Sequence, residues 1–392
     1  MSKDFDIIVY GASGFTGRLV AEYLASHKEA GEPIRWAMAG RSLEKLAEVR
    51  AEMGVSNDVP LVQVDSNDAD TVKTLVQSTK CVLTTVGPYQ LYGSAIVEAC
   101  AEHGTDYVDL CGEPGWMHEM IGKYDAAAKA SGARIVFSCG FDSIPFDLGV
   151  YALQHEAKEK FGSTASRVKC RVRAMNGEFS GGTAASLNAT MAALGTNPGL
   201  FEVLANPFSL SNGFQGPDQP AGDKPIHDED RDTWLAPFIM AAINTKNIHR
   251  SNALQGHAYG EDFVYDEMMV AGSGADGEAA AKFIAGHNPL TGDGVPQPGE
   301  GPDKASREAG NYDVLFIGEL ANGKTLDYGV SGDMDPGYGS TSKMIAQSAI
   351  CLVRDCADLK GGIYTPAPAM GAKLITRLQA HAGLKFALET SA

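Results

Sequence analysis

The stretch Phe5-Asp6-Ile7-Ile8-Val9-Tyr10-Gly11-Ala12-Ser13-Gly14-Phe15-Thr16-Gly17 decides the fold. Residues 5–10 are apolar and partly β-branched, which predicts a strand, and three glycines follow at the spacing G-x-x-G-x-x-G. Residues 18–25 then place apolar side chains on one helical face. In this context a dinucleotide pyrophosphate lies on the helix N-terminus, where unpaired N–H groups and the helix dipole favour an anion. We therefore predict a dinucleotide-binding loop formed by Gly11, Ala12, Ser13, Gly14, Phe15, Thr16 and Gly17.

The length and charge of the chain limit its function. A chain of 392 residues is long for a single core, so we expect two domains. The formal net charge is -17, which argues against nucleic acid and against an anionic membrane surface. The N-terminus has no apolar signal region, and no apolar run approaches the ~18 residues of a membrane span. We expect no membrane span and a cytoplasmic location.

The cysteines and histidines do not form a recognisable metal or nucleophile motif. Seven cysteines are scattered along the chain without a C-x-x-C pair, so free and mostly buried thiols are expected and no metal site is predicted. The nine histidines form no H-E-x-x-H, and the chain has no G-x-S-x-G elbow. Hydrolase and metalloenzyme functions are therefore disfavoured.

Six predicted strands alternate with helices in the first half of the chain. This alternation predicts a doubly wound parallel sheet of the Rossmann type with right-handed crossovers. The strands are expected at residues 5–10, 34–39, 60–65, 81–86, 107–113 and 133–138. A glycine follows or ends five of them, namely Gly11, Gly40, Gly87, Gly112 and Gly140. Ligands of such sheets bind beyond the carboxyl ends of the strands, so these glycines predict where the cofactor lies.

The second strand end indicates which dinucleotide is bound. An NAD-binding fold usually has a carboxylate there for the ribose 2′-hydroxyl, but this chain has Gly40-Arg41-Ser42. A guanidinium and a hydroxyl can hydrogen-bond a 2′-phosphate, so we predict NADP(H). The alternative is that Arg41 is a solvated residue that caps the helix expected at 43–53. Asp65, at the third strand end, could border the adenine pocket or cap the helix that begins near Asp68.

The fourth strand end completes the predicted cofactor site with Val86, Gly87 and Pro88. A glycine there allows close approach to the ribose of the cofactor, and Pro88 stiffens the chain beyond it.

The second half of the chain follows another pattern. Residues 168–175 alternate like a half-buried antiparallel strand. Two loops rich in proline and glycine, 205–232 and 286–311, could cover a substrate cleft or be surface insertions. Residues 318–325 formally match the phosphate loop G-x-x-x-x-G-K-[ST], but no helix-forming sequence follows the lysine. The pair Asn322-Gly323 instead predicts a β-hairpin.

Several longer motifs resemble the saccharopine-dehydrogenase-like oxidoreductases, and within them the trans-acting enoyl reductases. The matching motifs are GASGFTG (11–17), AGRS (39–42), TVGPY (85–89), DYVDLCGE (106–113), GFDSIPFDLG (140–149), SGGT (180–183), DPGYGSTSKM (335–344) and GGIYTPA (361–367). The resemblance implies an NADP-binding Rossmann domain, residues 1–148 plus about 340–392, whose C-terminal helices return to it. It implies a second α+β domain at about 149–339, inserted before those helices.

The resemblance also implies a function. It suggests reduction of a carbon–carbon double bond in a polyketide-type or fatty-acyl chain, in lipid metabolism, on a substrate held in trans by a polyketide synthase or an acyl carrier. Saccharopine dehydrogenases proper carry a tighter G-x-G-x-x-G loop, which makes the enoyl reductases the closer match. Arg41 and Ser42 would contact the dinucleotide, and Gly87 and Pro88 would lie beside its nicotinamide half. A homodimer is one possible assembly.

The reaction needs a hydrogen-bond donor and a proton near the acceptor of the hydride. Tyr89, Glu113, Asp142 and Ser143 follow strands and are therefore our catalytic candidates. Structural alternatives are that Asp142 caps a helix and Glu113 orients its loop. Two other functions stay open: an NADP-dependent dehydrogenase acting on a C–N bond of an amino-acid derivative, with Arg171 or Arg173 binding carboxylates, and a non-catalytic NADPH-binding scaffold.

Overall fold

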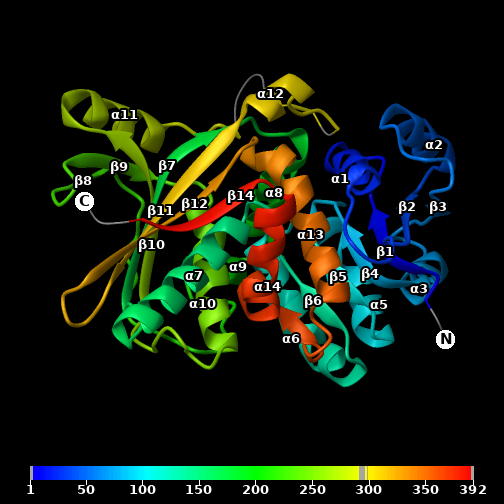
Figure 1. Ribbon diagram of the computed structural model, residues 1–392, viewed down its shortest axis with the longest axis horizontal. Helices are drawn as coiled ribbons and strands as arrows, with labels where there is room; N and C mark the ends of the chain where they lie inside the picture. The colour runs from blue at the N-terminus through cyan, green and yellow to red at the C-terminus, as the bar shows by residue number, and fades with distance from the viewer. Residues whose placement is uncertain (1–2, 291–295, 298, 390–392) are drawn as a thin grey trace.

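The computed structural model describes residues 3–290, 296–297 and 299–389. These residues form two seven-stranded sheets that lie side by side with helices around them (Figure 1). The first sheet is parallel throughout, in the order β13-β6-β5-β4-β1-β2-β3. Its strands are β1 (Phe5–Tyr10), β2 (Trp36–Gly40), β3 (Leu61–Gln63), β4 (Thr79–Thr84), β5 (Asp106–Val108), β6 (Arg134–Val136) and β13 (Gly362–Tyr364).

The strands β1, β2 and β4 are almost entirely buried on both faces, which explains their apolar runs. Alternate residues of β1 belong to different cores: Ile7 and Val9 pack in one hydrophobic cluster, and Ile8 and Tyr10 in the other. The helices that connect its first strands are α1 (Phe15–Ser26), α2 (Leu43–Glu52), α3 (Ala69–Ser78), α4 (Tyr89–Tyr92), α5 (Ser94–His103) and α6 (Pro114–Ser131). The predicted Rossmann-type sheet is therefore confirmed.

The second sheet has mixed strand directions, in the order β14-β12-β11-β7-β10-β9-β8. Its strands are β7 (Arg167–Asn176), β8 (Ile226–Asp228), β9 (Thr233–Pro237), β10 (Val264–Gly272), β11 (Asn311–Glu319), β12 (Thr325–Gly332) and β14 (Leu384–Glu389). The prediction of an antiparallel strand at 168–175 is half wrong, because β7 is antiparallel to β11 but parallel to β10. Alternation reports a half-buried face and carries no information about the direction of a neighbouring strand.

Helices cover the second sheet and fill its connections. They are α7 (Ile144–Phe161), α8 (Gly181–Thr196), α9 (Gly199–Ala205), α10 (Ala241–Leu254), α11 (Gly274–Gly286) and α12 (Lys304–Ala309). The two predicted loops are not wholly irregular, because 205–232 contains β8 and 286–311 contains α12. Residues 291–295 and 298 of the second loop lie outside the described residues. The strand expected at 107–113 is also shorter, since β5 ends at Val108.

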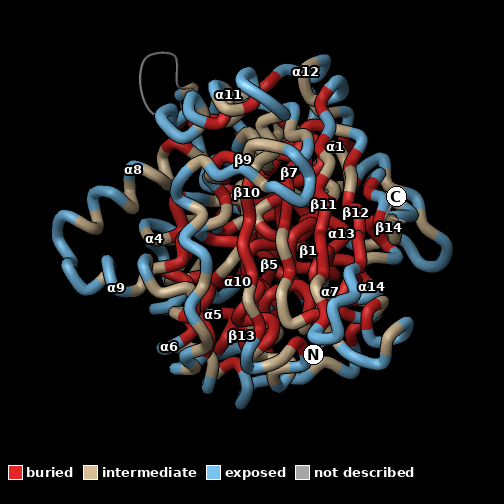
Figure 2. Tube along the Cα trace, turned by 90° about the vertical axis from the view of Figure 1, so that its left-hand side faces the viewer, coloured by how far each residue is buried: buried red, intermediate tan, exposed pale blue. Residues whose placement is uncertain are grey.

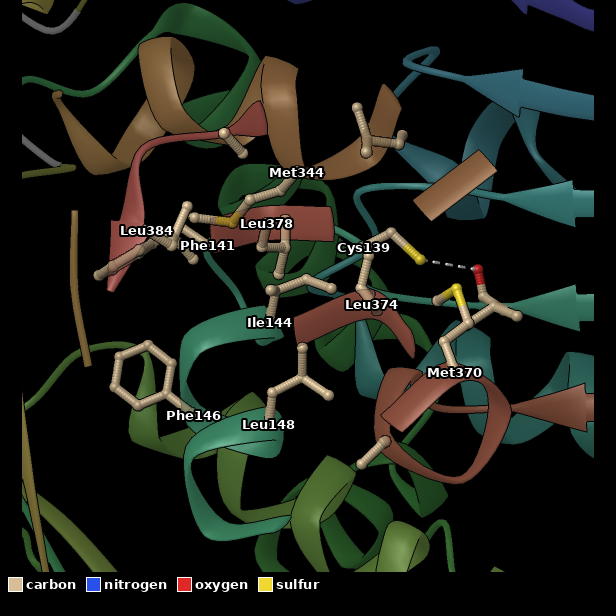
Figure 3. Packing of buried hydrophobic residues seen from close by; sticks show 14 of the residues in the cluster. Cys139, Phe141, Ile144, Phe146, Leu148, Met344, Met370, Leu374, Leu378 and Leu384 are labelled. Carbon is tan, nitrogen blue, oxygen red and sulfur yellow. Dashed lines mark hydrogen bonds between the residues drawn. The ribbon is translucent and has the colours of Figure 1, made fainter. Parts of the chain in front are cut away.

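The C-terminal part returns to both sheets. It contains a π-helical turn η1 (Pro336–Ser340), α13 (Thr341–Arg354), β13, α14 (Pro366–His381) and β14. Helix α13 packs against α1, β1, β4 and β5, so the expected return of C-terminal helices to the first domain is confirmed. Strand β13 extends the first sheet and β14 the second. Figure 3 shows side chains of α7, α13 and α14 packed in the core that joins the two sheets, among them Leu374 and Leu378, both fully buried. The division into residues 1–148 plus 340–392 and 149–339 stays a prediction.

Two further expectations are met. Residues 318–325 lie at the β11–β12 hairpin, where Gly323 has a positive φ of 80° and β12 follows Lys324 directly. All seven cysteines are free and buried.

Candidate functional site

The glycine loop forms a cradle that admits no side chain at two positions. Gly11 has a φ of +88°, and a Cβ there would lie 2.6 Å from Cγ2 of Val86. A Cβ on Gly17 would lie 2.1 Å from the carbonyl oxygen of Gly11, so only glycine lets α1 approach β1 this closely. Helix α1 begins at Phe15, and its N-cap residue Gly14 offers no side chain to bond the first-turn N–H groups. Those N–H groups are therefore available to an anion, and the cradle fits a dinucleotide pyrophosphate.

The guanidinium group of Arg41 lies just beyond the end of β2. Arg41 is exposed, and among the described residues its side chain makes no hydrogen bond or ion pair. Ser42 caps α2 by accepting a hydrogen bond from the N–H of Lys45 at 3.2 Å, so the cap is not supplied by Arg41. Asp68, and not Asp65, caps α3, which makes the capping alternative for Asp65 wrong. The Asp65 carboxylate instead accepts hydrogen bonds from the N–H and the amide group of Asn67.

The end of β4 lies beside the glycine loop and helix α8. The Thr85 hydroxyl donates to the carbonyl oxygen of Gly11 at 3.3 Å, so the segment 85–88 lies beside the glycine loop. A Cβ on Gly87 would lie 3.8 Å from the hydroxyl oxygen of Ser186, which belongs to α8. The predicted cofactor residues of β1 and β4 are thus brought together, with α8 against them.

Glu113 connects α4 to α8 through hydrogen bonds. Its carboxylate, 3% exposed, accepts four hydrogen bonds of 2.9 to 3.0 Å. The donors are the N–H of Tyr89, the N–H and side-chain amide of Gln90, and the hydroxyl of Ser186. Four donors fill the acceptor sites of a carboxylate. The arrangement corresponds to the orienting alternative for Glu113, since it joins α4 to α8.

Tyr89 and Ser143 use their hydroxyl groups within the fold. The Tyr89 hydroxyl accepts from the N–H of Leu110 at 3.0 Å and donates to the carbonyl oxygen of Thr84, and burial raises the pKa of Tyr89 well above its usual range. Ser143 is fully buried, and its hydroxyl accepts a 2.7 Å hydrogen bond from the side chain of Asn247. Their catalytic roles stay predictions.

The surroundings of Asp142 differ from those of Glu113, Tyr89 and Ser143. Its half-buried carboxyl makes no hydrogen bond to any residue that the structure describes, and burial raises its pKa to about 7. Ser143, and not Asp142, is the N-cap residue of α7, so the capping alternative for Asp142 is wrong. Burial raises the pKa of both Glu267 and Tyr338, and the charge of Asp142 adds to both shifts. The N–H of Phe141, next to Asp142, donates to the hydroxyl of Thr341, which directly follows the turn η1 that contains Tyr338.

Tyr338 connects this carboxyl to the glycine loop. Its ring contacts that of Phe15 edge-on, with centroids 5.1 Å apart. Its hydroxyl accepts from the N–H of Ser180 at 2.5 Å and lies 3.0 Å from the hydroxyl of Thr183. Asp142 therefore lies close to the start of both α1 and α8, at the carboxyl edge of the first sheet.

The second predicted loop reaches the same edge. The N–H of Gly181 donates to the carbonyl oxygen of Glu300, and a Cβ on Gly301 would lie 2.5 Å from the ring of Phe15. A cavity of about 680 Å³ lies between this loop and α1, lined by Phe15, Arg18, Glu178, Pro296, Gly299, Glu300 and Gly301. Described residues of the loop thus cover the helix end at which the pyrophosphate is expected.

Sequence reasoning assigns no role to several of these residues. Glu267 is 1% exposed, accepts hydrogen bonds from Tyr265 and Asn244, and has a pKa that burial raises to about 8. Ser186 and Tyr338 are likewise absent from the predicted site. Tyr338 lies within the motif DPGYGSTSKM (335–344), but the motif gives it no role. Ser186 and Tyr338 join the site through tertiary hydrogen bonds to Glu113 and Ser180, which lie 73 and 158 positions away in the chain. Within the described part of the chain, no group of three or more acidic, histidine or cysteine side chains could hold a metal ion, and no helix is long and apolar enough to cross a membrane.

Comparisons with known proteins agree with this geometry. The saccharopine dehydrogenase NADP binding domain family matches residues 7–136. A Mycobacterium tuberculosis protein, provisionally named a trans-acting enoyl reductase, is 39% identical over 406 aligned positions, covering 96% of each chain. The trans-acting enoyl reductase of Mycobacterium bovis is 34% identical with the same coverage. Saccharopine dehydrogenase (L-Glu forming) of Saccharomyces cerevisiae shares the fold, with a TM-score of 0.55 at 13% identity over 99% of this chain and 100% of that one.

The fold and the glycine cradle define a nicotinamide-dinucleotide-binding oxidoreductase. With relatives at 34–39% identity along almost its full length, the chain belongs to the saccharopine-dehydrogenase-like family that includes the trans-acting enoyl reductases.

Proposed function

We propose that this protein reduces a carbon–carbon double bond of an enoyl substrate by NADP(H)-dependent hydride transfer. The observation that carries the proposal is the match to trans-acting enoyl reductases along 96% of each chain. The acyl chain is of the polyketide or fatty-acid type. A partner that acts in trans, a polyketide synthase or an acyl carrier, presents it.

The preference for NADP(H) rests on the end of β2. Arg41 is exposed and uncommitted, and no carboxylate occupies the turn 40–42, where one would repel a 2′-phosphate. Gly11, Gly14 and Gly17 cradle the pyrophosphate. The bound dinucleotide supplies the hydride, and the residues of the chain bind and orient the reactants.

Asp142 supplies the proton. Hydride addition to an enoyl thioester leaves negative charge that a proton must neutralise. Asp142 is half-buried and unbonded beside Tyr338, and a pKa of about 7 leaves it largely protonated at slightly acid pH. It therefore has a proton to donate, and its carboxyl is only half-buried. Glu113 is less suited to this role, because its carboxylate is buried and already accepts four hydrogen bonds.

The arginines do not favour an amino-acid substrate. Arg171 is buried and paired with Asp266 at 2.8 Å, and Arg173 pairs with Asp313 and Glu389 at 2.7 and 2.6 Å. Guanidinium groups that are already neutralised in this way offer little attraction to the carboxylates of a substrate.

The experiment compares Arg41→Ala with the wild-type protein for binding of NADPH and NADH by titration calorimetry. Loss of a charged hydrogen bond at an exposed site should weaken NADPH binding by about 1.5 kcal/mol, roughly tenfold. NADH binding should be unchanged. Equal losses for the two cofactors would contradict the 2′-phosphate assignment. Turnover is then followed as loss of NADPH absorbance with an enoyl-CoA and with an imino acid, and turnover of the imino acid alone would exclude the enoyl substrate.

A further inference from the structure

Helices α8 and α9 form an arm that projects from the body of the protein and carries few charges (Figure 2). Residues 179–201 contain no acidic, basic or histidine side chain, although charged residues make up 21% of the chain. Only Gly181 and Ala184 of α8 are buried, and no residue of α9 is. Met191 is 60% exposed and Phe201 is 68% exposed. Exposed helices normally present charged or polar residues to water, so this arm needs another explanation.

The arm begins at the proposed active site. Thr183, in its first turn, lies 3.0 Å from the hydroxyl of Tyr338. One turn further, Ser186 donates to Glu113 beside Gly87. Another turn further, the Thr190 hydroxyl accepts a 3.2 Å hydrogen bond from the side chain of Gln90. Helix α8 therefore starts at the cofactor-binding edge, passes the end of β4 and continues outward.

An apolar strip lies along this course. Leu187, Met191 and Leu194 follow one another at i, i+4 and i+7, which places them on one side of α8. Leu91 and Tyr92 of α4, next to the residue that Thr190 bonds, are 61% and 42% exposed. We call these five residues the α8 strip. The rise of α8 from Thr183 to Leu194 is roughly 16 Å, longer than a crotonyl chain.

We propose that the α8 strip binds the acyl chain of the substrate, with the double bond at the Gly87 end and the chain running outward along α8. This inference rests on the proposed function and deepens it by identifying a specificity surface. Continuity with the cleft favours the chain of the same substrate over an unrelated ligand. A stretch of 23 residues without a charge suits hydrocarbon, whereas protein interfaces have a polar rim. The net charge of -17 disfavours an anionic lipid surface.

The test measures binding of palmitoyl-CoA, a saturated thioester that cannot be reduced, against CoA alone by calorimetry. Met191→Asp places a charge in the middle of the strip and should weaken palmitoyl-CoA binding about tenfold or more, without affecting binding of CoA. The control is Phe283→Asp on α11, where the replaced side chain is 68% exposed but lies outside the arm. The control should bind palmitoyl-CoA like the wild type. Equal palmitoyl-CoA affinity of Met191→Asp and the wild type would overturn the inference.

Turnover and assembly measurements separate this inference from the proposed function. With a long-chain enoyl-CoA and crotonyl-CoA as substrates, Met191→Asp should lower the ratio of their kcat/KM values. A wild-type protein that reduces neither compound would refute the proposed function, while the palmitoyl-CoA measurement would still decide the inference. If Met191→Asp instead converts a dimer into a monomer in sedimentation velocity, a second copy covers the strip and the acyl-chain proposal fails. Loss of binding to phosphatidylcholine vesicles by this variant would refute it in favour of a membrane.

Discussion

Replacing Glu113 by glutamine should lower stability without removing a proton donor. The Glu113 carboxylate receives two donors on each oxygen: Tyr89 N–H and Ser186 hydroxyl on Oε1, and the two Gln90 groups on Oε2. An amide has only one acceptor oxygen, so its NH₂ group must face a pair of donors whichever way it turns. At least one backbone N–H then loses its acceptor at a site that is 3% exposed. That loss costs ~1–3 kcal/mol, and the loss of charge assistance on the other bonds brings the expected destabilisation to about 2–4 kcal/mol.

Thermal unfolding and hydrogen exchange measure this effect. Glu113→Gln should lower Tm and speed exchange of the amides of residues 89–90. The matched variant Ser186→Ala removes one donor, leaves the carboxylate with three, and should cost only about 1 kcal/mol. If Glu113→Gln is as stable as the wild type but inactive at every pH, then Glu113 is a catalytic group and the reasoning from its four donors is wrong.

Two further predictions follow from carboxyl groups whose pKa burial raises. The kcat of the wild type should fall as pH rises through about 7, because a proton donor must be protonated. Asp142→Asn should be slow, and its pH–rate profile should lack this fall. If the fall is unchanged in Asp142→Asn, Asp142 is not the proton donor. Glu267 has a pKa of about 8 in the folded protein against an ordinary value of 4.5, so the unfolded chain loses its proton first and stability falls between these values as pH rises. In urea unfolding, the free energy of unfolding of Glu267→Gln minus that of the wild type should therefore increase from pH 5 to 8 and then level off. A difference that does not change with pH would contradict the raised pKa of Glu267.

The first sheet could be predicted from sequence because its signals are local. Apolar residues mark each strand from β1 to β6, and the glycine loop lies directly between β1 and α1. Strand β13 is not predicted from the sequence because it joins the sheet only through tertiary pairing with β6, whose paired residues lie 228 positions away in the chain. The direction of β10 beside β7 escapes prediction for a related reason: it is set by the long connection through α8, α9 and α10 and not by residues of the strand. Local patterns report burial, whereas strand neighbours depend on the whole chain.

Glu113 and Asp142 also differ in their tertiary contacts and not in their local sequence patterns. Glu113 and Asp142 look alike in the sequence, since each follows a strand and a glycine. The donors that occupy Glu113 come from α4 and α8, at least 23 residues away in the chain. Asp142 receives no such donor from the described residues, and its neighbours are Tyr338 and the acidic Glu267. Tertiary structure thus gives the two carboxyl groups different surroundings: four hydrogen bonds hold that of Glu113, whereas burial without donors raises the pKa of Asp142. This difference is why we predict that Glu113 positions α4 and α8 and that Asp142 exchanges a proton.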